Sequence, residues 1–443
     1  MQIGKIFSQK TVFFPLLALI AGLGIFRWRS ERARDFYQFW VVGQAIRSME
    51  LTNIYSAQDR QRIGQHFLDL AMAQGASAAH LKAAAYRRII NPAGTPFLYS
   101  VFYLTSRGDY DFDYTVFRIL SYVVYLLSII VLCEVLGVPR LLALFLAVLL
   151  TEYFAPFRLD VMEGNVNQIQ VGTIAFLLWL RSRKTGAWVE LVSGLVCGLL
   201  IMFKPNLAPV AIFLLGGTFL LKSIKPALLQ AGAMGLGTAI GFGLPLVLFG
   251  KVCNWEQWRA AFPQLVLLPR YFYRSFLSLF FHVQSLPPFF MLGALLMIIP
   301  FLLGALRGGS RGNTEQGGQD KKEAMDSHLN PDHLWMGLGV CVALLASTLV
   351  HYHYFLLIVP GLLILFRTSG PICGFSSLKE LRWMPLGLIV FLLMASRVSL
   401  TGEGNDLFDS DWRLAYIGTL LLYIFGFYRL LRERRIDSTR AKG

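Results

Sequence analysis

Long hydrophobic runs alternate with short polar turns along almost the whole chain. A helix needs about 17 to 25 mostly apolar residues to cross the hydrocarbon core of a membrane, and several runs reach this length. Others are shorter and would have to tilt or include flanking residues. The predicted spans are residues 11–26, 114–136, 140–156, 168–181, 187–203, 207–221, 226–249, 287–306, 334–350, 353–366, 383–396 and 412–430. The pattern therefore predicts an all-α, polytopic membrane protein with about twelve transmembrane helices in a single membrane domain, residues 1–443.

The composition agrees with a membrane protein. Of the 443 residues, 55% are hydrophobic and 15% are charged, whereas about 25% of the residues of a typical soluble domain are charged. The formal net charge of +15 does not indicate nucleic-acid binding, because Lys and Arg fall mainly in loops where membrane topology and lipid headgroups account for them. The five cysteines show no Cys-x-x-Cys spacing, so neither a disulfide framework nor a metal knuckle is indicated.

Two basic segments predict the orientation of the chain in the membrane. The tail after residue 428 and the hydrophilic stretch 307–333 are rich in Lys and Arg, and loops of this kind face the cytoplasm. We interpret 307–333 as a cytoplasmic linker loop. Alternating spans then place both termini in the cytoplasm and gather the unusual polar residues on the outer face of the cell inner (plasma) membrane. No small-residue cleavage pattern follows the first run, so we expect it to be a retained anchor.

The first outer loop, residues 27–113, predicts juxtamembrane amphipathic helices. Residues 36–49 place Phe36, Phe39 and Trp40 on one helical face, and residues 58–72 form a second amphipathic stretch. The many Lys and Arg residues do not overturn the outer position, because the charge rule weakens for loops longer than about 60 residues. They indicate an anionic ligand instead. The apolar run 96–104 is too short to cross, so we expect a juxtamembrane or re-entrant piece.

Several motifs along the chain together resemble one family. They are Asp35-Phe36-Tyr37-Gln38-Phe39-Trp40 with Gly43 and Ile54-Tyr55, then Asn91 to Phe97, then Gly164-Asn165-Val166-Asn167-Gln168, and then Gly194 to Gly198 leading into Phe203-Lys204-Pro205. In this order they resemble glycosyltransferase family 87, whose best-known members are polyprenol-phosphate-mannose-dependent α-mannosyltransferases. The resemblance covers residues 11 to 367 and implies a membrane fold of the GT-C type. Two departures are that the usual paired prolines are separated, and that Asn165 stands where the family usually has Gln.

Asp35 is the strongest candidate for catalysis. Sugar transfer with inversion needs a general base within hydrogen-bond reach of the acceptor hydroxyl, on the face opposite the departing phosphate. A carboxylate at the bilayer surface can meet both a lipid donor and an acceptor on the water side. The alternative is a helix N-cap, a position that Asp favours and that does not exclude a catalytic role.

The remaining candidates are predicted to hold the donor and the acceptor. Lys204, by the resemblance, would bind the donor phosphate, although a Lys at a helix end can also reach the membrane interface. Polar turns and aromatic belts are the structural alternatives for the others. The expected phosphate-binding residues are Lys204, His351, His353 and Arg270, and the expected sugar-binding or acceptor-binding residues are Trp40, Asn165, Asn167, Gln168 and Tyr352.

No metal and no cofactor are expected. Asp109, Asp111 and Asp113 form an Asp-x-Asp-x-Asp pattern. A calcium loop needs more oxygen ligands and a Glu at a fixed spacing, and neither follows here.

The resemblance, together with the position of Asp35, implies a glycosyltransferase that works at the membrane. It would move a hexose, with mannose as the expected sugar, from a polyprenyl-phosphate donor to a hydroxyl of a lipid or glycan acceptor. Membrane lipids are its further expected partners. Two alternatives stay open. A transporter or lipid flippase would place polar residues near the bilayer midplane. A polysaccharide polymerase or ligase would depend on Arg and His in a late loop, and Asp35 would be dispensable.

Overall fold

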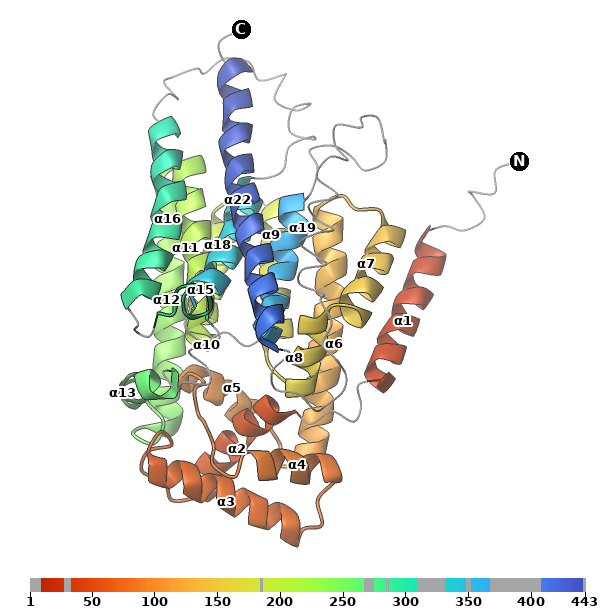
Figure 1. Cartoon of the computed structure of the whole chain (residues 1–443), viewed down its shortest axis with the longest axis vertical. Coiled ribbons are helices and arrows are strands. Elements are labelled where there is room, and N and C mark those ends of the chain that lie inside the picture. The colour runs from red at the N-terminus through yellow and green to blue at the C-terminus, as the bar shows by residue number, and fades with distance from the viewer. Residues whose placement is uncertain are drawn as a thin grey trace, which may run out of the picture.

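The structure is a computed structural model that describes residues 9–27, 33–183, 186–266, 275–283, 285, 287–308, 331–347, 352–366 and 408–440. Within these ranges the chain forms helices and no β-strand. Long helices run side by side as a bundle, and shorter helices cover one end of it (Figure 1). The predicted all-α class is therefore confirmed.

The bundle helices coincide with the predicted apolar runs. They are α1 (Gln9–Arg27), α6 (Tyr110–Val135), α7 (Arg140–Glu152), α9 (Asn167–Arg183), α10 (Ala187–Phe203), α11 (Ala208–Leu221), α12 (Ile224–Phe249), α16 (Pro287–Gly308), α18 (Pro331–Leu345), α19 (Ile358–Phe366) and α22 (Phe408–Arg440). The predicted run 383–396 and most of the predicted linker 307–333 lie outside the described residues.

Within the described residues, fewer helices have the length and hydropathy of a membrane span than the pattern predicts. Among the described residues, 3 helices are long and apolar enough, namely α6, α12 and the part of α22 at Arg413–Leu431. A fourth span results if α7 and α8 (Ala155–Glu163) count as one bent pair. The other apolar stretches whose side chains the structure describes, such as Phe13–Arg27 in α1 and Pro287–Leu303 in α16, have only 10–17 residues. The prediction of about twelve spans is therefore confirmed only for these few. On α12 the apolar side chains of Leu228, Leu236 and Val247 face outward, which suits contact with lipid.

The predicted run 140–156 forms two helices instead of one. α7 ends at Glu152, and α8 leaves it at an angle of 60°. Pro156, in the first turn of α8, explains the break, because proline has no N–H to donate to the preceding turn and its ring clashes with the carbonyl group of that turn. The bend turns α8 toward the covered end of the bundle.

Short helices form a cap over this end of the bundle (Figure 1). They are α2 (Arg34–Ser48), α3 (Ala57–Ala73), α4 (Ala78–Tyr86), α5 (Pro96–Thr105) and α13 (Trp255–Val266). Side-chain oxygens of Ser56, Ser77 and Thr95 accept hydrogen bonds from the first turns of α3, α4 and α5, as N-cap residues do. The helices predicted at 36–49 and 58–72 correspond to α2 and α3, and the run 96–104 to α5. The short α15 (Phe276–Phe281) follows α13 along the chain.

α2 is buried on all sides along most of its length. Every residue from Phe36 to Gly43 is buried, because α3, α4, α5, α6 and α8 surround the helix. A helix buried on all sides belongs to a core. The expected amphipathic character of residues 36–49 is therefore wrong for α2, which is the central element of the cap.

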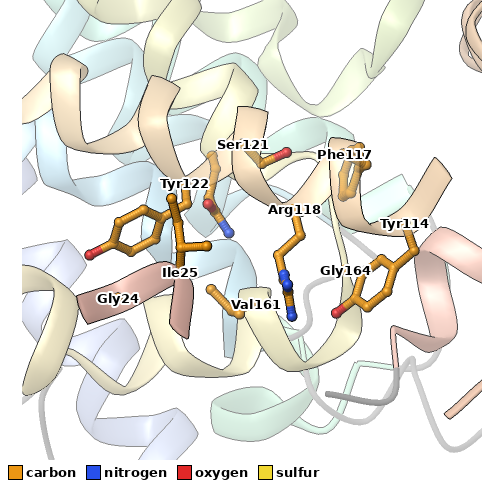
Figure 2. Close-up of a pocket in the computed structure, with 10 residues that line it drawn as sticks. Gly24, Ile25, Tyr114, Phe117, Arg118, Ser121, Tyr122, Val161 and Gly164 are labelled. Atoms are coloured by element: carbon orange, nitrogen blue, oxygen red, sulfur yellow. The ribbon is translucent and has the colours of Figure 1, made fainter. Parts of the chain in front are cut away.

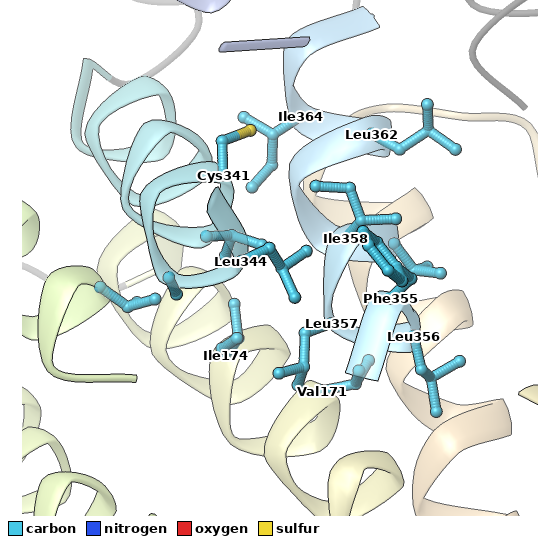
Figure 3. Close-up of a cluster of buried hydrophobic side chains, with 14 of the residues drawn as sticks. Val171, Ile174, Cys341, Leu344, Phe355, Leu356, Leu357, Ile358, Leu362 and Ile364 are labelled. Atoms are coloured by element: carbon cyan, nitrogen blue, oxygen red, sulfur yellow. The ribbon is translucent and has the colours of Figure 1, made fainter. Parts of the chain in front are cut away.

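A large apolar core fixes the bundle beside the cap. Figure 3 shows side chains of α9, α18 and α19 meeting, with Val171 and Ile174 from α9, Leu344 from α18, and Ile358 from α19. The preceding 3₁₀ helix, η3 (Tyr352–Leu357), contributes Phe355 to the same core. This packing holds η3 against α8 and α9.

The glycine-rich run of α10 serves close helix packing. A Cβ atom at Gly194 would lie 2.2 Å from the carbonyl oxygen of Gln230, and one at Gly198 would lie 2.2 Å from that of Met234. Small residues let two helix backbones approach this closely. The run therefore joins α10 to α12 and fixes the end of α10.

The start of α2 and the end of α8 touch through two left-handed residues. Ala33 has φ 45° and its N–H donates to the carbonyl oxygen of Met162 at 3.0 Å. Gly164, with φ 65°, ends α8, and a Cβ there would lie 2.9 Å from Cβ of Phe36 and 3.1 Å from Cβ of Ala33. Only glycine fits such a contact without strain.

Three helices are tied together by a buried charge cluster. The Arg181 guanidinium donates to Glu190 at 2.7 Å and to the Thr218 hydroxyl at 2.9 Å, and Lys222 donates to Glu190 at 2.8 Å. On the same helix, the exposed Arg183 pairs with the exposed Glu134. The two pairs differ mainly in burial.

Glu190→Gln is expected to lower the free energy of unfolding by about 3 kcal/mol, because the buried Arg181 guanidinium would lose its carboxylate partner. Glu134→Gln is the matched control and is expected to cost less than about 1 kcal/mol. Unfolding by heat or denaturant in detergent micelles measures both. Equal losses for the two variants would contradict a stabilising role of the buried cluster.

Gly164→Ala is expected to lower the free energy of unfolding by about 2 to 4 kcal/mol, from left-handed strain and from overpacking against α2. Gly75→Ala separates the two causes, because Gly75 has φ 61° but its Cβ would meet no atom within 4 Å. It is expected to cost only the strain, about 1 to 2 kcal/mol. If the same unfolding measurement gives both variants the same loss, the contact between α2 and α8 is not tight.

Candidate functional site

Residues far apart in the chain meet where the cap joins the bundle. Asp35 lies in the first turn of α2, Asn165 lies in the turn from α8 to α9, Asn167 begins α9, and Lys204 follows α10. A carboxylate of α8, Asp160, completes the group. We call these five residues the Lys204 cluster.

Asp35 is held by donors on both carboxylate oxygens. Arg87 Nη2 donates to Oδ1 at 2.6 Å, and Asn165 Nδ2 donates to Oδ2 at 2.7 Å. His353 Nε2 lies 3.8 Å from Oδ2. The Asp35 side chain is 18% exposed, so this carboxylate is not fully enclosed.

Asp35 does not cap α2. The N-cap position belongs to Ala33, and Asp35 lies within the first turn of the helix. The alternative interpretation of Asp35 as an N-cap is therefore wrong. A carboxylate in the first turn is still favourable, because it faces the positive end of the helix dipole.

Lys204 lies at the centre of the cluster. Its Nζ donates to Asn165 Oδ1 at 3.0 Å and to Asn167 Oδ1 at 2.8 Å, and it lies 4.1 Å from the centre of the Tyr354 ring. Pro205 follows, and Lys204 has the extended backbone that a residue before proline prefers. This break between α10 and α11 turns the side chain inward rather than along the helix to the interface.

Removal from water lowers the pKa of Lys204 to about 8, and the carboxylates of Asp160 and Asp35 oppose this change. The amine is therefore mostly charged at neutral pH and loses its charge in the alkaline range.

The sequence did not predict that Asp160 and Arg87 belong to the site. Asp160 is fully buried, and its oxygens accept from Asn167 Nδ2 at 2.7 Å and from Gln168 Nε2 at 3.1 Å. The only sequence signal was an acid a few residues before a Gly-Asn-x-Asn-Gln turn. Arg87 is one of many basic residues in the loop 27–113, and no local sequence pattern predicts its contact with Asp35.

An outer ion pair reinforces the same junction. The guanidinium of Arg34 makes two hydrogen bonds to the Glu163 carboxylate, one of them from Nε at 2.9 Å, and lies over the Tyr86 ring. Arg87 Nε donates to the carbonyl oxygen of Arg34 at 3.1 Å. The pair thus links α2 to α8 and to the end of α4 around Asp35.

The other candidates lie at the edge of the cluster, in buried parts of the cap and of η3, or outside the described residues. Trp40 is buried in the cap, where its Nε1 donates to Asp113 Oδ2 at 2.9 Å. Tyr352 is buried in η3, and its ring packs against Phe355. His353 borders the cluster, and Asn167 Nδ2 lies 3.3 Å from its carbonyl oxygen. The predicted phosphate ligands His351 and Arg270 lie outside the described residues.

The Asp-x-Asp-x-Asp pattern has structural partners. Asp109 caps α6, Asp111 accepts from Ser77, and Asp113 accepts from the backbone N–H groups of Arg107 and Gly108. Over the residues that the structure describes, no group of His, Cys, Asp or Glu could hold a metal ion.

A narrow pocket adjoins the cluster between α1, α6 and α8. Figure 2 shows Arg118 extending from α6 toward Val161 and Gly164. Gln168, which binds Asp160, also lines this pocket, and its Oε1 has no hydrogen-bond partner among the described residues. Gln168 thus contacts both the pocket and Asp160 of the Lys204 cluster.

Neither a family model, nor a curated protein, nor a solved structure matches this chain. Its function has to be inferred from the chemistry of the Lys204 cluster.

Proposed function

We propose that the protein is a glycosyltransferase that takes a hexose from a polyprenyl-phosphate donor, with Asp35 as its general base. The observation that carries this proposal is the double role of Asn165. Its Nδ2 donates to Asp35 while its Oδ1 accepts from Lys204. A potential base and a potential phosphate-binding cation are therefore fixed one carboxamide apart.

The two groups suit opposite ends of the transfer step. The acceptor oxygen attacks the anomeric carbon while its proton passes to Asp35, and the bond from that carbon to the phosphate oxygen breaks with its electron pair. The ammonium of Lys204 would stabilise the phosphate as it leaves, with His353 beside it. Such electrostatic stabilisation typically supplies several kcal/mol in a site that excludes water.

The position of the cluster suits a lipid-linked substrate. It lies at one end of a bundle whose helices α6, α12 and α22 are able to cross a membrane. A polyprenyl chain could stay in the lipid while the sugar phosphate enters at the cap. In this proposal the cap faces the outside of the cell inner (plasma) membrane, the sugar is mannose, and the acceptor is a lipid or a glycan.

Asp35→Asn is expected to slow transfer by at least about 100-fold, because loss of a general base typically costs 10²- to 10⁴-fold. Purified protein is incubated with radiolabelled polyprenyl-phosphate mannose and an acceptor extract, and released polyprenyl phosphate is counted. Asp69→Asn is the control, since Asp69 binds only Gln65 on the exposed side of α3 among the described residues. Undiminished transfer by a folded Asp35→Asn protein would remove Asp35 from the role of base.

The pH dependence provides a separate test of Lys204. With a pKa of about 8, Lys204 carries its charge below this pH and loses it above, so kcat/KM for the donor is expected to fall as the pH rises through about 8. In Lys204→Arg the guanidinium stays charged over this range, and the alkaline fall should disappear. The same alkaline fall in both proteins would assign it to another group.

A further inference from the structure

We infer that Asp160 is a positioning residue for the transfer step. It holds the Asn167 carboxamide with its oxygen toward Lys204, and it remains as the counter-charge of Lys204 while Asp35 carries the acceptor's proton. This inference rests on the proposed function and adds a residue that the sequence did not single out.

The hydrogen bonds around Lys204 form two matching arms. In each arm an asparagine gives its oxygen to Lys204 and its nitrogen to a carboxylate. Asn165 reaches Asp35 at 2.7 Å, and Asn167 reaches Asp160 at 2.7 Å. A carboxamide placed between a cation and an anion has one favourable orientation, because only its nitrogen donates and only its oxygen accepts.

The two carboxylates differ in exposure. The Asp35 side chain is 18% exposed, whereas Asp160 is fully buried. Asp160 therefore cannot meet a substrate hydroxyl, and both of its oxygens are already bonded to Asn167 and Gln168. A buried carboxylate is costly unless a charge or several donors compensate it, and Lys204, one carboxamide away, provides that charge.

The difference in exposure between Asp35 and Asp160 gives the two carboxylates different roles in the transfer step. When the O–H bond of the acceptor breaks, its proton neutralises Asp35, and the negative charge moves to the departing phosphate. Lys204 must stay charged through this change in order to bind the phosphate. Burial raises the pKa of Asp160 to about 7, and the charge of Lys204 opposes this change. Above this pH the Asp160 carboxylate is ionised, and it takes no part in the proton transfer, whereas Asp35 later returns its proton to water.

Several ionisable groups of neighbouring elements face Lys204. They are Asp35 on α2, Asp160 on α8 and Tyr354 on η3, and His353 of η3 lies beside Asp35. Asp160 is joined to Lys204 by hydrogen bonds through Asn167, so its removal changes this arm and leaves the hydrogen bonds of Asp35 in place.

Asp160→Asn tests the inference. The variant is expected to lower kcat/KM by about 10- to 100-fold and to move the alkaline limb of the pH profile down by about 1 unit, the shift expected when a nearby opposite charge is lost. Asp113→Asn is the matched control, because Asp113 is also a buried acid but bonds only within the cap among the described residues. It should lower the unfolding temperature and leave the alkaline limb in place.

A second measurement needs no activity. In protein labelled with ¹³C-lysine, the resonance that Lys204→Arg removes belongs to Lys204, and its titration is followed without substrate. The midpoint should fall in Asp160→Asn and stay unchanged in Asp113→Asn. An unchanged midpoint in Asp160→Asn would overturn the inference, whereas a wild-type protein that fails to transfer sugar would overturn the proposed function alone.

Asn167→Ala is a second variant that tests the inference if the Asp160→Asn protein does not fold. It removes the bridge and keeps the carboxylate, so it should also lower the midpoint of Lys204. In a double-mutant cycle the two changes should be far from additive, because both break the same arm. Additive losses, or an unchanged midpoint in Asn167→Ala, would show that Asp160 does not act through Asn167.

Discussion

The placement of one ammonium group, that of Lys204, organises the junction of cap and bundle. A charge removed from water needs close polar partners, and here they come from separate elements: Asp35 from α2, Asp160 from α8, Asn165 from the turn into α9, and Asn167 from the start of α9. Each partner is in turn fixed by helix packing. The geometry of the cluster is therefore a property of the whole fold rather than of one motif.

The cluster also explains why small residues occupy particular positions. Gly164 lets α8 end against α2, and the glycines of α10 let its C-terminal end approach α12. These glycines decide how closely the backbones that carry Asp35, Asn165 and Lys204 can approach, and a charged network tolerates little displacement because hydrogen bonds weaken steeply with distance and angle.

Hydrophobic runs were sufficient to predict most bundle helices, because burial against neighbours or lipid leaves a long apolar signal. Asn165, Asn167 and Lys204 stood out as polar residues at the ends of such runs, and the structure brings them together. The break at Pro156, the complete burial of α2, and the roles of Asp160 and Arg87 were missed. These depend on which elements meet in space, and Asp160 between Leu159 and Val161 carries no local sign of its partners.

The cluster joins residue 35 to residue 204, and η3 adds the backbone of residue 353. Contacts this far apart in sequence form late, because the intervening loop must close first. During synthesis the first acid would emerge long before its asparagine and lysine partners. It must therefore wait in water or beside the membrane surface, and a nascent chain that stops before η3 would contain an unfinished site.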